Sequence, residues 1–148
     1  MNTVKVTTPT HPLALAGYAI VAMSGFTFLA GVSRATALLE AWSVALYAAW
    51  AVVMMLSGIT CLVAASITHR LIDPRWTLKA ELYGCLGVGL VLTCYEVSLL
   101  QLDGAPFAAV TTQLLVLAIG GGSLWRAAQL FFELRRINES VRSDSYVK

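Results

Sequence analysis

Apolar residues in this chain gather into four long stretches separated by short polar segments. The stretches cover residues 13–32, 42–67, 82–102 and 106–132. A membrane-spanning α-helix needs about 20 consecutive, mostly apolar residues, and each stretch reaches that length. Backbone groups in lipid must find hydrogen-bond partners within their own segment, and the alternating pattern of a barrel strand is absent. We therefore expect an all-α, polytopic membrane protein built as a four-transmembrane-helix bundle.

Prolines and polar turns mark the ends of these stretches. Pro12 and Pro106 stand where a first helical turn begins, and Asp73-Pro74 indicates a turn before the third helix. Residues 103–106 form so short a link that the third and fourth helices are expected to be antiparallel neighbours. The first stretch is too long for the apolar region of a signal peptide, so we expect it to persist as a helix of the mature protein.

The composition indicates that most of the surface faces lipid. Hydrophobic residues make up 58% of the 148 residues and charged residues 12%, whereas soluble proteins carry about 25% charged residues. A small soluble domain has too much surface per volume to leave that surface so apolar. The net charge of +2 excludes a strongly basic nucleic-acid-binding protein. The expected partners are the lipid bilayer and, within it, further copies of the chain or another membrane protein.

The distribution of positive charge predicts an orientation, because Lys and Arg accumulate on the cytoplasmic side of membrane proteins. With four crossings, both ends of the chain and the middle loop share one side. That side holds nine of the ten Lys and Arg residues, and the other side holds only Arg34. We expect a multi-pass protein of the cytoplasmic membrane with both termini cytoplasmic. Residues 1–12 then form a cytoplasmic lead and residues 133–148 a cytoplasmic amphipathic tail.

Small residues mark the faces on which the helices are expected to pack, because close approach drives helix association where lipid is as apolar as leucine. Within residues 42–67 they recur at a spacing of four and predict one narrow stripe on one face. The candidate helix-packing residues are Ala41, Ala45, Ala49, Ser57, Gly84, Gly87 and Gly122. Packing within one bundle is the favoured interpretation, and a subunit interface is the alternative. Trp50 is deep enough in its stretch to be a packing residue as well.

Glu96 is the acid that lies well inside a predicted span, about 21 Å along the helix from Leu82. Intramembrane acids are costly, and Glu96 is therefore the candidate functional acid for a proton, a cation or an aqueous path. The alternative is that it reaches the outer interface and meets water or Arg34. Arg126 and Glu81 both lie near the inner interface on neighbouring helices, and we expect them to pair as a structural contact.

The residues after Phe132 keep a helical pattern, with an apolar stripe of Leu130, Leu134, Ile137 and Val141. Basic residues flank this stripe and are the candidates for contact with anionic lipid at the membrane surface: Arg135, Arg136 and Arg142. Three interpretations stay open for the tail. It lies on the membrane, it packs on a helix of a partner, or it is a frayed extension of the fourth helix.

Candidate catalytic chemistry is sparse. The three cysteines, Cys61, Cys85 and Cys94, lie inside apolar stretches without the spacing of a metal site, and we expect them to be small buried apolar residues. His11 and His69 have no acid or cysteine cluster beside them. We therefore expect no enzyme, no cofactor and no metal site.

Two motifs carry a resemblance to known proteins. One is Asp73-Pro74-Arg75-Trp76 followed by Lys79-Ala80-Glu81-Leu82-Tyr83-Gly84. The other is Leu124-Trp125-Arg126-Ala127-Ala128-Gln129-Leu130 followed by Glu133-Leu134-Arg135-Arg136. With these motifs the second half of the chain resembles small four-helix membrane proteins encoded by bacteriophages of actinobacteria. The resemblance implies the host inner membrane. Some small phage membrane proteins of this size are holins or partners of holins.

Three functions from different classes are consistent with these patterns. The first is a non-catalytic membrane module that associates through helix packing and a basic cytoplasmic tail. The second is a holin-like protein that oligomerises and permeabilises the membrane, although few polar residues could line a large hole. The third is a small ion-coupled transporter that uses Glu96, although such proteins carry more intramembrane polar groups and broken helices. We favour the first.

Overall fold

The structure is a computed structural model that describes residues 12–33, 35, 38–39, 42–66, 74–100 and 107–145. In this part of the chain the long elements are all α-helices: α1 (Pro12–Leu29), α3 (Val44–Ser66), α4 (Pro74–Leu100) and α5 (Phe107–Ser145). The prediction of an all-α protein is confirmed.

The lengths of the helices partly match the prediction of four spans. Three described helices are long and apolar enough to cross a membrane: Val44–Ser66, Arg75–Leu99 and Gln113–Glu139. The corresponding apolar stretch of α1, Ala14–Leu29, is shorter. α1 ends earlier than residue 32 because Gly31 adopts a φ of 71°. The Val32 amide then donates to the Thr27 carbonyl at 3.0 Å and the Gly31 amide to the Phe28 carbonyl at 3.2 Å, which caps the helix end.

The second half of the chain is more helical than the hydropathy pattern predicts. α4 begins at Pro74 rather than at residue 82, because proline suits a first helical position and the charged residues of the added turns do not oppose a helix. α5 continues without a break from Phe107 to Ser145, so residues 133–145 of the predicted tail extend the last helix. Part of the tail's apolar stripe packs on the chain itself, since Leu134 is buried and Ile137 packs against the core.

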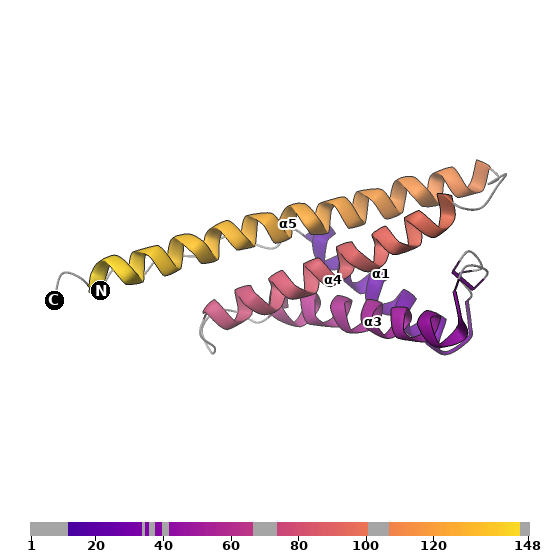
Figure 1. Ribbon diagram of the computed structural model, residues 1–148, viewed down its shortest axis with the longest axis horizontal. Coiled ribbons are helices and arrows are strands. Elements are labelled where there is room, and N and C mark those ends of the chain that lie inside the picture. The colour runs from indigo at the N-terminus through magenta and orange to yellow at the C-terminus, as the bar shows by residue number, and fades with distance from the viewer. Residues whose placement is uncertain are drawn as a thin grey trace.

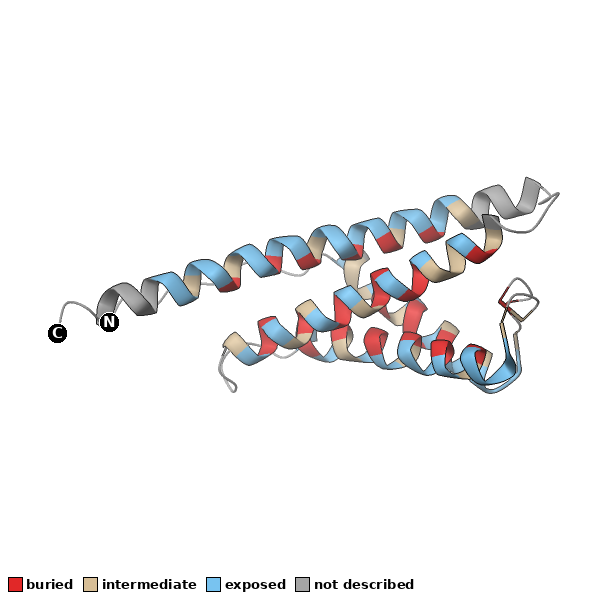
Figure 2. Ribbon diagram, in the orientation of Figure 1, coloured by how far each residue is buried: buried red, intermediate tan, exposed pale blue. Residues whose placement is uncertain are grey.

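The helices are arranged as successive neighbours, with α1 against α3, α3 against α4 and α4 against α5. In Figure 1, α3, α4 and α5 follow one another across the molecule, α1 crosses behind α3 and α4, and the C-terminal end of α5 projects beyond the start of α4. Figure 2 shows that the buried positions of α5 lie on the side facing α4, whereas the opposite side is exposed. α5 therefore belongs to the bundle through one face only.

Glycines allow α1 and α3 to approach closely. A Cβ atom at Gly25 would lie 2.6 Å from the backbone nitrogen of Met55, and one at Gly58 would lie 2.6 Å from the backbone nitrogen of Ala22. Each glycine thus faces the backbone of the other helix, in the manner of small-residue contacts between membrane helices. The sequence reasoning did not single out this pair, because Gly25 and Gly58 belong to no repeated small-residue spacing that we recognised.

Some of the predicted packing residues lie between α3 and α4. Ser57 is buried on α3, and Gly84 and Gly87 face it from α4. A Cβ atom at Gly84 would lie 2.6 Å from Cys61 Sγ, and one at Gly87 would overlap Ser57 Oγ. These three residues therefore permit the close approach for which they were proposed.

The single narrow stripe predicted along α3 is wrong. Ala45 and Ala49 are exposed, and Ala41 lies outside the described residues. The physical reason is the helical period of 3.6 residues. Each step of four residues advances the position by about 40° around the axis, so Ala45 and Ser57 lie about 120° apart. Gly122 is also exposed, and among the described residues no atom of another helix lies within 4 Å of a Cβ built there.

Aromatic side chains from α1, α3 and α4 pack together in the core. Trp50 is buried, as predicted, and its ring lies 5.5 Å from that of Phe28, 6.1 Å from that of Tyr47 and 6.0 Å from that of Tyr95. Its Nε1 donates a hydrogen bond of 2.9 Å to the Val91 carbonyl. The indole thus fills space between α1, α3 and α4 and satisfies its own donor, which a buried tryptophan requires.

Candidate functional site

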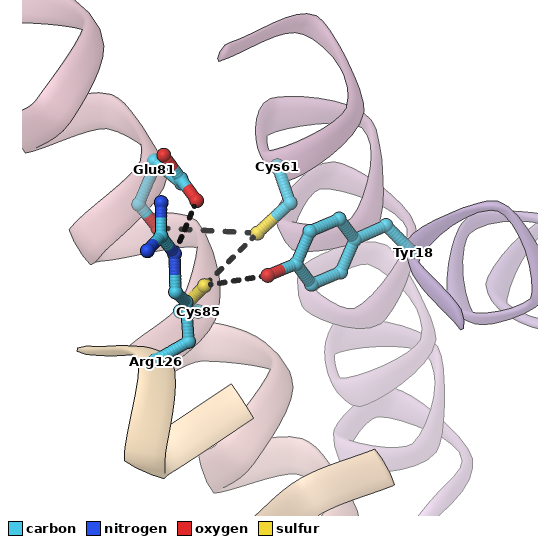
Figure 3. Close-up of polar contacts among 5 residues, drawn as sticks. All are labelled: Tyr18, Cys61, Glu81, Cys85 and Arg126. Carbon is cyan, nitrogen blue, oxygen red and sulfur yellow. Dashed lines mark hydrogen bonds and ion pairs between the residues drawn. The ribbon is translucent and has the colours of Figure 1, made fainter. Parts of the chain in front are cut away.

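The most concentrated chemistry in the described residues is a set of five side chains that we call the buried polar cluster. It contains one residue from α1, one from α3, two from α4 and one from α5: Tyr18, Cys61, Glu81, Cys85 and Arg126 (Figure 3). Cys61 and Cys85 are both 0% exposed, and Tyr18 and Glu81 are buried as well. All four helices therefore meet at this one level of the bundle.

The ion pair between α4 and α5 is the charged part of the cluster. Arg126 Nε donates to Glu81 Oε1 at 2.8 Å, which confirms the predicted pairing. The side chains are 18% and 7% exposed, respectively, so neither charge is well solvated. A charge in such a place is stable only when it is paired, and removal of one partner leaves the other uncompensated. The pair thus couples the positions of α4 and α5.

The thiols and the phenol form the neutral part of the cluster. The Tyr18 hydroxyl and the Cys85 thiol share a hydrogen bond of 3.2 Å. Cys61 Sγ lies 3.8 Å from Cys85 Sγ and 3.9 Å from the carbonyl oxygen of Glu81. Each polar atom therefore has a partner in the low-dielectric interior, as buried polar groups require.

The chemistry available to the buried polar cluster is limited. Neither thiol is in a disulfide, and their burial keeps them from water-soluble reagents. Among the described residues no group of three or more His, Cys, Asp and Glu side chains is placed to hold a metal ion. The arrangement links helices through hydrogen bonds and one ion pair, and it presents no nucleophile beside a base in an open cleft.

The sequence reasoning treated the cysteines separately and missed that Cys61 and Cys85 meet. A signal for it exists, because both residues lie at the same distance along the sequence from Asp73, which comes between α3 and α4. In two antiparallel helices joined by a loop, residues equally far from the loop lie at the same level. We found no comparable feature of the sequence that predicts the contact of Tyr18 with Cys85.

Glu96 lies apart from the buried polar cluster, on the part of α4 near its C-terminal end. It is partly buried, and its Oε2 atom has no hydrogen-bond partner among the described residues. Arg34, the cation proposed as its alternative partner, lies outside the described residues. Tyr95 beside it lines an apolar pocket of about 160 Å³, to which all four helices contribute side chains.

The basic candidates of the tail are on the surface. Arg135 and Arg136 are exposed on α5, and the side chain of Arg142 lies outside the described residues. Arg135 Nε donates to Glu139 Oε1 at 2.9 Å, with both side chains more than 60% exposed. An exposed pair one helical turn apart contributes little to stability, so Arg135 is free to exchange this partner for another anion.

The chain was compared with protein-family models, with curated proteins and with solved structures, and none of them matches it. The class of protein is therefore defined by the structure alone. It is an all-α protein with three helices that are long and apolar enough to cross a membrane.

Proposed function

We propose that the chain is a multi-pass protein of the cytoplasmic membrane that acts as a non-catalytic module. In this proposal four helices cross the bilayer with both termini in the cytoplasm. The protein associates with other membrane components through the uncovered faces of its helices and through the basic end of α5. The observation that carries the proposal is the apolar surface that the bundle leaves uncovered.

That apolar surface is extensive on the outer helices. Of the 18-residue apolar window that marks each span, only 28% is buried inside the chain in α5 and 33% in α3. The large hydrophobic side chains exposed on α5 include Leu114, Leu115, Leu117, Leu124, Phe131 and Phe132. Contiguous apolar surface of this kind is not stable in water and marks contact with lipid or with other proteins.

The fourth crossing and the shared side of the termini are supported by length and charge. α1 has 18 residues, which corresponds to about 27 Å, close to the roughly 30 Å thickness of the hydrocarbon core. Trp76 on α4 and Trp125 on α5 are exposed, and the Lys79 ammonium lies 5.5 Å from the centre of the Trp76 ring. Exposed tryptophans and lysine near the predicted inner interface are typical of the headgroup layer.

We expect cysteines introduced at Val4 and Ser143 to be protected from a membrane-impermeant maleimide in intact cells. A cysteine at Ser33, in the turn after α1, should be labelled in the same cells. Labelling of all three after permeabilisation checks that each thiol is reactive, and the unmodified chain controls for its native cysteines. Labelling of the Val4 variant in intact cells would contradict the proposed orientation.

A holin-like function is the second candidate, and one observation favours it. Ala118, Gly121 and Gly122 are exposed on α5, and no atom lies within 4 Å of a Cβ built at either glycine. Small residues four apart on an outward face suit association between identical helices in lipid. Among the described residues no side chain of another helix packs against either glycine, so a second copy of the chain is the partner under this hypothesis.

Membrane potential, followed with a voltage-sensitive dye during induced expression, separates the candidates. We expect a steady potential for the membrane module, compared with a four-helix control expressed to the same level. An abrupt, timed collapse that persists in a Glu96→Gln variant would favour the holin-like function. An ion-dependent flux that the Glu96→Gln variant abolishes would instead favour transport, to which the unpartnered Oε2 atom of Glu96 points.

A further inference from the structure

A groove between the beginning of α4 and the end of α5 combines basic, polar and apolar side chains. We call it the α4–α5 groove. It is lined from α4 by Lys79, Leu82 and Tyr83, and from α5 by Phe131, Leu134, Arg135, Asn138 and Glu139. Its volume is about 420 Å³, within the range of about 300 to 1,000 Å³ that is common for small-molecule sites.

The lining side chains are sorted along the length of the α4–α5 groove. α4 and α5 are antiparallel, so Lys79 on α4 and Glu139 on α5 lie toward the same end of the bundle. Moving toward the middle of the bundle, the lining changes to Leu82 on α4 and Phe131 on α5. The step from Glu139 to Phe131 is about 12 Å along the helix axis. One end of the groove is therefore charged and the other end is apolar. The distance between the two ends matches the length of a lipid headgroup together with the first part of its acyl chain.

The charged end favours a single negative charge. Lys79 and Arg135 bring two positive charges and Glu139 one negative charge, and Asn138 adds amide donors. Glu139 already forms an ion pair with Arg135, but both side chains are exposed and the pair costs little to break. A phosphate oxygen between Lys79 and Arg135 would meet two cations and a neutral donor, which is the chemistry of anionic headgroup sites between membrane helices.

We propose that the α4–α5 groove binds the phosphate headgroup of an anionic phospholipid, whose acyl chains then follow Leu82 and Phe131 toward the bilayer centre. The inference rests on the proposed membrane orientation, which places the charged end of the groove at the cytoplasmic headgroup layer. There the exposed Trp76 beside Lys79 marks the same level. The bound lipid fills a groove that the chain leaves open and ties the projecting end of α5 to the membrane surface.

Native mass spectrometry of the full chain tests the proposal. The protein is released from micelles containing equal amounts of phosphatidylcholine and phosphatidylglycerol, and the lipids retained are counted. We expect preferential retention of phosphatidylglycerol, and about tenfold weaker retention in a Lys79→Gln/Arg135→Gln variant. A matched control, Lys5→Gln/Arg75→Gln, removes the same charge from the same predicted side of the membrane, at residues that are not among those lining the groove, and should retain phosphatidylglycerol within about twofold of the unmodified chain. Glu139→Gln should raise retention, because it removes the competing carboxylate.

Three results would overturn the proposal. The first is equal retention of the two lipids by the unmodified chain. The second is an equal loss in both double variants, which would indicate general surface charge. The third is displacement of phosphatidylglycerol by inorganic phosphate, which would show that the acyl chains contribute nothing.

Alkaline extraction of vesicles carrying the protein separates failure of the groove from failure of the proposed function. A chain that is extracted contradicts membrane insertion and with it the lipid site. A chain that stays inserted but shows no lipid preference contradicts the α4–α5 groove alone.

Discussion

Replacement of Gly25 or Gly58 by alanine should lower the free energy of unfolding by about 3 kcal/mol, the upper end of the usual cost of overpacking. The added methyl group would lie 2.6 Å from a backbone nitrogen of the facing helix, at Met55 or Ala22. A flexible side chain could move aside, but a helix backbone cannot, so α1 and α3 would have to separate. The loss is measured by titrating the detergent-solubilised protein with dodecyl sulfate and following the unfolding midpoint.

The matched control for this experiment is Gly121→Ala. Gly121 is exposed on α5, and among the described residues no atom of another helix lies within 4 Å of a Cβ built there. Alanine is the better helix former by about 1 kcal/mol in soluble helices, so the control should be neutral or slightly stabilising. If Gly25→Ala and Gly58→Ala shifted the midpoint no more than Gly121→Ala, the close packing of α1 on α3 would be refuted.

Replacement of Arg126 by alanine should destabilise the bundle by about 3 kcal/mol or more, because it leaves the Glu81 carboxylate buried without its partner. The Glu81 side chain is only 7% exposed, so water cannot take over the role of the guanidinium. The same unfolding titration measures the effect. A Glu81→Met/Arg126→Met variant, which removes both charges and keeps the volume, should recover most of the lost stability.

The Arg135–Glu139 pair supplies the control for the Arg126 prediction. It has nearly the same hydrogen-bond length, 2.9 Å against 2.8 Å, but its side chains are 68% and 64% exposed. Arg135→Ala in lipid-free detergent should therefore cost no more than about 1 kcal/mol. If Arg126→Ala and Arg135→Ala lowered the stability of the protein equally, burial of the Glu81–Arg126 pair would not make that pair more important for stability.

Contacts between helices joined by a short loop were within reach of sequence reasoning. Glu81 and Arg126 lie near the same predicted membrane interface, on neighbouring helices joined by the link at residues 103–106, and their pairing was predicted from that placement. Cys61 and Cys85 lie equally far along the sequence from Asp73, so the short connection between α3 and α4 would have predicted the thiol contact as well. A tight connection forces two helices to be antiparallel, and the level of each residue is then a matter of counting.

The sequence by itself determined that the chain forms helices, where the apolar stretches lie and which residues are charged. These follow from the length and composition of local segments, because a backbone in an apolar environment must satisfy its own hydrogen bonds. It could not determine which side of a helix faces its neighbour. A uniformly apolar helix offers no polar face to mark its outside, so Ala45 and Ser57 looked equivalent.

Only the tertiary structure decided the orientation of each helix about its own axis. Gly25 and Gly58 face backbones because α1 and α3 interlock there, whereas Gly121 and Gly122 face outward because α5 contacts α4 through its other side. The same arrangement brings Tyr18 to Cys85 across 67 positions of the chain. Close packing among four helices selects these rotations, since shape complementarity and not hydropathy distinguishes one apolar face from another.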